Sequence, residues 1–123
     1  MSRILLVDDN LDFLKVQLRF LESLGHQVEC ARDGKEGFEI SQTQSFDLII
    51  SDILMPEREG IESIRGWRKE FPNIKILAIS GGGSTSAREN LTLAAYLGAN
   101  ATLMKPYSLT DLRQKLAELL GNG

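Results

Sequence analysis

The sequence has little of the chemistry that depends on sulfur or imidazole. Among 123 residues there is one cysteine, Cys30, and one histidine, His26. A single cysteine permits no intrachain disulfide, which fits a reducing cytoplasm, and a lone histidine does not build a metal cluster. The apolar neighbours of Cys30 favour a buried structural thiol. The turn-like position of His26 favours a plain surface role.

Long apolar runs and blocks of one charge are also absent. Between Arg3 and Asp8 lie only four strongly apolar residues, far too few for a signal-sequence core or a membrane span. The 14 basic and 17 acidic residues are dispersed and give a net charge of −3, so we expect no direct binding to nucleic acid. Hydrophobic residues make up 42% and charged residues 25%, which indicates one soluble, cytoplasmic globular domain over residues 1–123.

Short apolar runs alternate with helical patterns along the chain. In the intervals between the runs, apolar residues recur every three or four positions, as in amphipathic helices. Five such strand–helix units predict an α/β fold, in which a parallel sheet lies between two layers of helices. The pattern leaves the order of the strands open. The expected strands lie near residues 3–8, 27–31, 47–52, 75–80 and 100–104.

Local signals mark where the expected helices begin and end. Asp33-x-x-Glu36 and Ser108-x-x-Asp111 have the spacing of capping boxes and predict two helix starts. The helix after Asp33 contains residues that lower helix propensity, namely Gly37, Ser41 and Thr43. Three glycines predict helix ends: Gly25, Gly98 and Gly121.

Five polar residues stand where apolar runs end: Asp8, Asp9, Asp52, Ser80 and Lys105. If the runs are parallel strands of one sheet, their carboxyl ends lie along one edge, where open α/β sheets bind ligands. Three carboxylates, one hydroxyl and one ammonium would then converge. This combination is suited to binding a divalent cation and a phosphoryl group.

The three carboxylates predict a magnesium site. Their repulsion in a partly dry cleft would raise the pKa of one carboxyl unless a cation intervened. Mg2+ prefers oxygen ligands and typically combines one or two carboxylates with phosphate oxygens. A plainer interpretation is that residues 8–10 only turn the chain, with Asn10 capping the next helix. Two acids before a cap are more than a turn needs, which favours the metal.

Asp52 is the candidate nucleophile. Carboxylates accept phosphoryl groups and become aspartyl phosphates, and this transfer depends mainly on positioning and charge neutralisation. Lys105 and Mg2+ would offset charge on the phosphoryl oxygens, and the Ser80 hydroxyl would hydrogen-bond one of them.

Residues 5–10 (LLVDDN), residues 52–56 (DILMP) with Gly60, and residues 105–107 (KPY) resemble the response-regulator receiver domain of two-component signalling. The resemblance extends over the whole chain. It implies a flavodoxin-like, doubly wound sheet of five parallel strands in the order 2-1-3-4-5 with five helices, the order of the chemotaxis receiver.

The resemblance also implies a ligand set and a phosphoacceptor. Asp52 is then the residue that is phosphorylated and a ligand of the metal. Asp9 should bind Mg2+ directly, Asp8 mainly through water, and the backbone carbonyl of Leu54 should supply a further ligand.

The same resemblance implies roles and partners for the remaining groups. Ser80 matches the switch hydroxyl, and Lys105 matches the lysine that contacts the phosphoryl group and precedes a cis peptide bond. The donor would be a sensor histidine kinase or a phosphotransfer protein. The last strand and last two helices would change surface and signal to an unknown output partner. Such a protein is a signalling switch that catalyses only its own phosphorylation and dephosphorylation.

The chain departs from the family pattern in three places. Thr102 occupies the position of the switch aromatic, which puts the usual coupling to Ser80 in doubt. Residues 81–83 are all glycine, so this loop either eases closure on a phosphoryl group or is a simple connector. The next helix carries two apolar stripes, and the second is either a partner surface or part of a more deeply buried helix. The stripes are Leu91, Ala94 and Ala95, and Leu93 and Leu97.

Two other classes of function compete with this interpretation. A phosphorylation-independent interaction module on the same fold is weakly favoured by Thr102 and opposed by the intact acidic residues. A phosphatase of the haloacid dehalogenase type needs a second acid two residues after its nucleophile, where this chain has Leu54. The glycines at 81–83 also lack the spacing of a dinucleotide site. The sequence leaves open the kinase, the output, the oligomeric state and whether the chain is part of a longer one.

Overall fold

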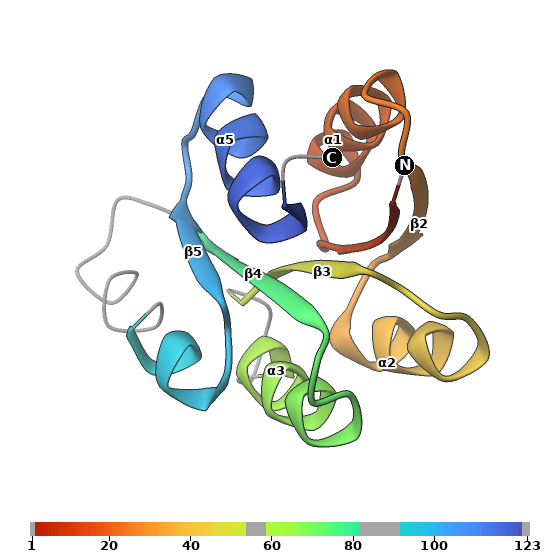
Figure 1. The fold of residues 1–123 in the computed structure, drawn as a ribbon, viewed down its shortest axis with the longest axis vertical. Helices are drawn as coiled ribbons and strands as arrows, with labels where there is room; N and C mark the ends of the chain where they lie inside the picture. Colours follow the sequence, from red (N-terminus) through yellow and green to blue (C-terminus); the bar gives the residue numbers. More distant parts are fainter. Residues whose placement is uncertain (1, 54–58, 82–91, 122–123) are drawn as a thin grey trace.

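The computed structural model describes residues 2–53, 59–81 and 92–121. Five parallel strands form one sheet in the order β2-β1-β3-β4-β5 (Figure 1). This is the flavodoxin-like order, so the predicted fold class is confirmed. Each strand limit lies within one residue of its predicted position. The strands are β1 (Arg3–Val7), β2 (Gln27–Ala31), β3 (Leu48–Asp52), β4 (Lys75–Ser80) and β5 (Ala101–Met104).

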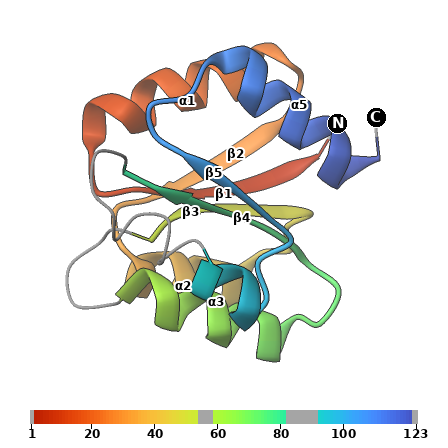
Figure 2. The same cartoon turned by 90° about the vertical axis from the view of Figure 1, so that its left-hand side faces the viewer.

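Helices cover both faces of the sheet (Figures 1 and 2). Helices α1 (Leu11–Ser23) and α5 (Leu109–Leu120) lie on one face. Helices α2 (Gly34–Thr43) and α3 (Glu59–Glu70) lie on the other, together with the helical residues 92–97. In the described part of the chain, no helix combines the length and the apolar character that a bilayer crossing requires.

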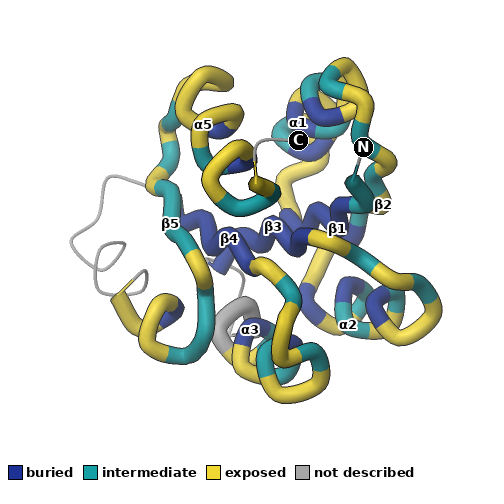
Figure 3. The backbone as a smooth tube through the Cα atoms, viewed as in Figure 1, coloured by how far each residue is buried: buried dark blue, intermediate teal, exposed yellow. Residues whose placement is uncertain are grey.

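The sheet separates two apolar cores, because successive residues of a strand point to opposite faces. In β1, Ile4 and Leu6 pack with residues of α1 and α5, whereas Leu5 and Val7 pack with Trp67 of α3 and its neighbours. Strands β3 and β4 are buried almost throughout, and the edge strands β2 and β5 are partly exposed (Figure 3). The buried inner strands therefore fix the positions of the residues at their carboxyl ends.

Helix α2 tolerates its poor helix formers because tertiary packing requires them. A Cβ on Gly37 would lie 2.9 Å from a methyl carbon of Val7 and 3.3 Å from the Trp67 ring, so only glycine fits there without a shift. The Ser41 hydroxyl donates to the carbonyl of Phe38 at 2.6 Å and accepts the indole N–H of Trp67 at 3.2 Å. The low intrinsic propensity is thus offset by close contact between α2, β1 and α3.

The predicted helix ends are confirmed. Asp33 accepts a hydrogen bond from the Glu36 amide at 2.7 Å, and Ser108 and Asp111 form a complete capping box. The three glycines predicted to end helices all have positive φ, with values of 92°, 129° and 73°.

Some burial predictions were wrong. In the segment 92–97, Leu93 is exposed and Ala94 is buried, but Ala95, which shares an apolar stripe with Ala94, is exposed because only a narrow stripe of this helix is buried. Leu91 lies outside the described residues. Cys30 is half-buried, and burial raises the pKa of its thiol. His26 is half-buried too, and its Nδ1 accepts a hydrogen bond from the Ser2 amide at 3.2 Å.

Candidate functional site

The carboxyl edge of the sheet brings four predicted site residues together. Asp8 directly follows β1, Asp52 and Ser80 are the last residues of β3 and β4, and Lys105 directly follows β5. Because β1 lies beside β3 and β4 beside both β3 and β5, these residues come from adjacent strands. The strand order therefore creates the site from residues far apart in the sequence.

Asp8 is held in place by the turn that leads into α1. Its amide donates to the Ala31 carbonyl at 3.1 Å, and its Oδ1 accepts the Asn10 amide at 2.9 Å. The Asn10 side chain in turn accepts the Phe13 amide at 3.1 Å and caps α1, as predicted. The Asn10 amide thus holds the Asp8 carboxylate in place, in a residue that is only 1% exposed.

Three carboxylates converge at this edge. Asp8, Asp9 and Asp52 each offer an oxygen, and these oxygens lie within 4.8 Å of one another. Asp8 and Asp52 are buried, whereas Asp9 is exposed to solvent. Burial raises the pKa of Asp8, and the nearby charge of Asp52 raises it further. A cluster with this surplus of negative charge and oxygen donors fits a hard divalent cation such as Mg2+.

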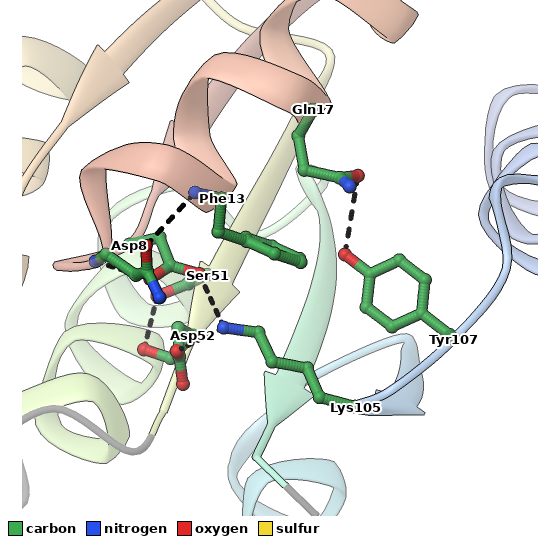
Figure 4. Close-up of polar contacts among 8 residues, drawn as sticks. Asp8, Phe13, Gln17, Ser51, Asp52, Lys105 and Tyr107 are labelled. Atoms are coloured by element: carbon green, nitrogen blue, oxygen red, sulfur yellow. Dashed lines mark hydrogen bonds and ion pairs between the residues drawn. The ribbon is translucent and has the colours of Figure 1, made fainter.

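The ammonium of Lys105 bridges two of these acids (Figure 4). Its Nζ donates to Asp8 Oδ2 at 2.9 Å and to Asp52 Oδ2 at 3.0 Å, and its side chain is 18% exposed. Burial alone would lower the pKa of Lys105, but these hydrogen bonds and charges outweigh burial and raise it. The peptide bond between Lys105 and Pro106 is cis, in agreement with the family pattern.

Ser80 presents an unsatisfied hydroxyl. The residue is fully buried, and its Oγ has no hydrogen-bond partner within the ranges that the structure describes. Its carbonyl accepts the Lys105 amide at 2.7 Å, so the backbone is fixed while the side chain remains available. A buried polar group left unpaired costs about 1–3 kcal/mol. A ligand oxygen that accepts from this hydroxyl would remove that cost.

The sequence analysis did not predict that two aromatic rings, those of Phe13 and Tyr107, lie together beside Lys105. The ring of Phe13 lies with its centroid 3.9 Å from Lys105 Nζ, and it meets the Tyr107 ring edge-to-face at 5.8 Å and 88° (Figure 4). The Tyr107 hydroxyl donates to Gln17 at 3.4 Å. Burial, followed by the charges of Asp8 and Asp52, raises the pKa of Tyr107. A signal existed, since Phe13 and Gln17 are four residues apart and share one face of α1.

Two predicted features cannot be placed in the site. The carbonyl of Leu54 and most of the glycine loop, Gly82 and Gly83, lie outside the described residues. Thr102 is half-buried in β5, opposite Ala78 of β4.

Known proteins resemble this chain over nearly its whole length. The response regulator receiver domain family matches residues 4–117. The response regulator receiver protein CpdR of Brucella abortus is 33% identical over 120 residues, covering 98% of this chain and 98% of CpdR. Sensor kinase CckA of the same organism is 34% identical over 121 residues, covering 97% of this chain and 12% of CckA.

A solved structure shows the same fold. The crystal structure of chemotaxis protein CheY4 from Vibrio cholerae superposes with a TM-score of 0.84 at 29% identity, covering 97% of this chain and 98% of CheY4. Relatives differ widely in length, however. The chain spans about half of the transcriptional regulatory protein CpxR homolog of Haemophilus influenzae and of the response regulator MprA of Mycolicibacterium vanbaalenii, in addition to its small share of CckA.

Proposed function

This chain belongs to the response regulator receiver domain family, and from that premise we propose that it is phosphorylated on Asp52 during two-component signalling. Receiver domains are phosphoryl-accepting signalling switches. The observation that carries the assignment to Asp52 is its place at the end of β3, almost buried, with the Lys105 ammonium 3.0 Å from its carboxylate. We further propose that residues 1–123 form a single receiver domain that works in the cytoplasm.

The proposed reaction is one phosphoryl transfer. An oxygen of the Asp52 carboxylate attacks the phosphorus of a phosphohistidine on the donor protein. The new O–P bond forms an acyl phosphate as the P–N bond breaks, and the departing imidazole nitrogen keeps the electron pair and takes up a proton. Such a transfer needs positioning and charge neutralisation more than covalent help.

Two side chains of the site suit the phosphoryl product. The ammonium of Lys105 already contacts Asp52 and would interact with an oxygen of the attached phosphoryl group. The Ser80 hydroxyl, which lacks a partner among the described residues, would donate to another. The phosphoryl group would add negative charge at the end of β3, and its interactions with Ser80 and Lys105 would extend to the ends of β4 and β5, which is how phosphorylation typically biases a switch.

The acidic cluster is the proposed magnesium site. Asp9 and Asp52 would bind the ion directly, Asp8 mainly through water, and the carbonyl of Leu54 would add a further ligand. When bound, Mg2+ supplies positive charge that offsets the charge on the transferring phosphoryl group. The convergence of three carboxylate oxygens within 4.8 Å of one another supports this role, because a divalent cation would offset their mutual repulsion.

The proposed donor is a histidine kinase or a phosphotransfer protein. A sensor kinase, CckA, contains a segment similar to this chain, which supports a place in such a relay. The proposed output surface comprises β5 and the helices on either side of it, and signals to a partner that is still to be found. Large apolar side chains are exposed on these elements: Leu93, Tyr96, Met104 and Leu109.

We expect a small phosphodonor such as phosphoramidate to phosphorylate the chain once. The reason is that phosphoryl acceptance depends on the receiver's own groups and on Mg2+. Intact-mass spectrometry should show the addition of one phosphoryl group with Mg2+ present, and none when the metal is chelated. The adduct should be lost in base, as acyl phosphates are. A chain that stays unmodified with Mg2+ would instead favour the phosphorylation-independent interaction module.

We expect Asp9→Ala to weaken the response to Mg2+ and to stabilise the metal-free protein. A ligand that binds only the native state stabilises it by about 2.7 kcal/mol at a concentration one hundred times its Kd. Removal of Asp9 takes away one donor and also part of the carboxylate repulsion. Thermal melts with and without Mg2+ measure both effects. An equal Mg2+ shift in the variant and the parent would show that the cation does not bind at this cluster.

A further inference from the structure

The ammonium of Lys105 is enclosed by two carboxylates and one aromatic face. Its Nζ lies 2.9 Å from Asp8 Oδ2 and 3.0 Å from Asp52 Oδ2, and 3.9 Å from the centroid of the Phe13 ring. A cation within about 6 Å of a ring centroid is attracted by the negative face of the ring. The side chain of Lys105 is 18% exposed, so water screens this attraction only in part.

The carboxylates of Asp8 and Asp52 also take part in the proposed reaction, whereas the Phe13 ring does not. Under the proposed function, an oxygen of Asp52 bonds to phosphorus, and Asp8 and Asp52 belong to the magnesium site. The ionic contacts of Lys105 with Asp8 and Asp52 therefore weaken when Mg2+ and the phosphoryl group occupy the site. Lysine has a long flexible chain that loses rotamer freedom when it is held in one place. Of the three contacts that the Lys105 ammonium makes with described residues, that with Phe13 alone draws on none of the oxygens that the reaction uses.

The ring of Phe13 is itself fixed from two sides. The backbone amide of Phe13 donates to the side-chain oxygen of Asn10 at 3.1 Å, and the Asn10 amide in turn donates to Asp8. Its ring meets Tyr107 edge-to-face, and the Tyr107 hydroxyl donates to Gln17, which is only 4% exposed. The ring therefore has a defined place between α1 and the residues after β5.

We propose that Phe13 is a positioning residue, whose ring face holds the Lys105 ammonium towards Asp52 while the phosphoryl group is transferred. This inference rests on the proposed phosphorylation of Asp52. Phe13 touches no reacting atom and acts only through Lys105. A leucine at position 13 would fill much of the same space but would not attract a cation. Phe13→Leu is therefore expected to slow phosphorylation by about fivefold while the protein remains folded.

Fluorination of the ring separates attraction from packing. Phe13 is replaced site-specifically by phenylalanine carrying one, two or three fluorine atoms, which weaken the negative ring face with little change of shape. With phosphoramidate and saturating Mg2+, the rate of phosphorylation should fall stepwise, to about one-fifth with three fluorines. Phe20, which is half-buried further along α1, is the matched control. The same series at Phe20 should leave the rate unchanged.

A second measurement reports on Lys105 without any phosphodonor. In the metal-free parent, NMR should show the methylene protons next to Nζ shifted upfield by the Phe13 ring, and Phe13→Leu should abolish this shift. Phe13→Tyr, which retains a ring, should preserve both the shift and most of the rate.

Each result decides between named alternatives. If the parent is phosphorylated and the fluorinated Phe13 proteins react equally fast, the proposed role of Phe13 is wrong and the function of Asp52 stands. An unchanged Lys105 shift in Phe13→Leu would contradict the ring contact itself. If the parent takes up no phosphoryl group, the proposed function fails and this inference falls with it.

Discussion

Asp52→Asn is expected to slow phosphoryl transfer to this chain at least about a thousandfold, which corresponds to roughly 4 kcal/mol of barrier. An amide oxygen carries no full negative charge and is a poor nucleophile, whereas the parent carboxylate lies beside the Lys105 ammonium at the end of β3. The measurement is a time course of intact mass with phosphoramidate and Mg2+. Parent and variant are compared at equal protein concentration.

A matched substitution controls for the loss of negative charge. Asp12→Asn makes the same chemical change at an exposed acid in the first turn of α1, outside the acidic cluster. This control should be phosphorylated at the parent rate. A denaturant melt confirms that both variants fold. Equal rates for Asp52→Asn and the parent would show that the nucleophile is another residue.

Lys105→Met is expected to destabilise the metal-free protein by about 3 kcal/mol, because breaking a buried ion pair leaves uncompensated charge in the interior. The side chains of Asp8 and Asp52 are 2% and 6% exposed, and both would lose the ammonium that they now share. The methionine side chain extends as far as the Cε of lysine, which limits the loss of packing. Urea unfolding with a metal chelator present measures the change.

The loss of stability in Lys105→Met should depend on pH and on Mg2+. Without the ammonium, the pKa of Asp8 rises above its already raised value, so the native state binds a proton that the unfolded state releases. Stability then falls as pH increases from about 4 through the raised pKa. The variant should therefore lose less stability at pH 5 than at pH 8, and saturating Mg2+ should restore part of the loss.

Lys115→Met is the control for removing a lysine. Lys115 lies on α5 with its Nζ 3.8 Å from Glu118 Oε1, and both side chains are substantially exposed. Surface pairs of this kind contribute about 0–1 kcal/mol, so this variant should unfold nearly as the parent does. An equal loss in the free energy of unfolding for both lysine variants would show that Lys105 does not compensate the charges of Asp8 and Asp52.

The sequence predicted which residues meet at the carboxyl edge of the sheet, because strand ends determine their placement. Asp8, Asp52, Ser80 and Lys105 follow recognisable apolar runs, and parallel pairing brings such ends to one edge of the sheet. The order of the strands in the sheet could not be predicted from the apolar pattern. Apolar patterns show which faces are buried but not which strands are neighbours, so the order 2-1-3-4-5 came only from the resemblance to receiver domains.

The features that were missed depend on contacts between distant elements. Phe13 has the pattern of an ordinary core residue, and its contact with Lys105 exists only once α1 is placed beside the residues after β5. Gly37 looked like a weakness of α2, but it allows close packing against Val7 and Trp67. Ala95 shares an apolar stripe with the buried Ala94 but is exposed, because periodicity does not show how wide a stripe a helix buries.

Some predictions concern parts of the chain beyond the described residues. The Leu54 carbonyl as a metal ligand stays a prediction that rests on the family resemblance. The behaviour of Gly82 and Gly83 stays a prediction that rests on the conformational freedom of glycine.

The location of the phosphoryl group tests the account most directly. The parent protein is phosphorylated with Mg2+ and treated with borohydride, which reduces an aspartyl phosphate to homoserine and releases the phosphate. Peptide mapping by mass spectrometry then identifies the reduced residue. We expect homoserine at position 52 alone, and none when Mg2+ is chelated during phosphorylation. Homoserine at a different aspartate, or a stable phosphate on a hydroxyl residue instead, would contradict the account.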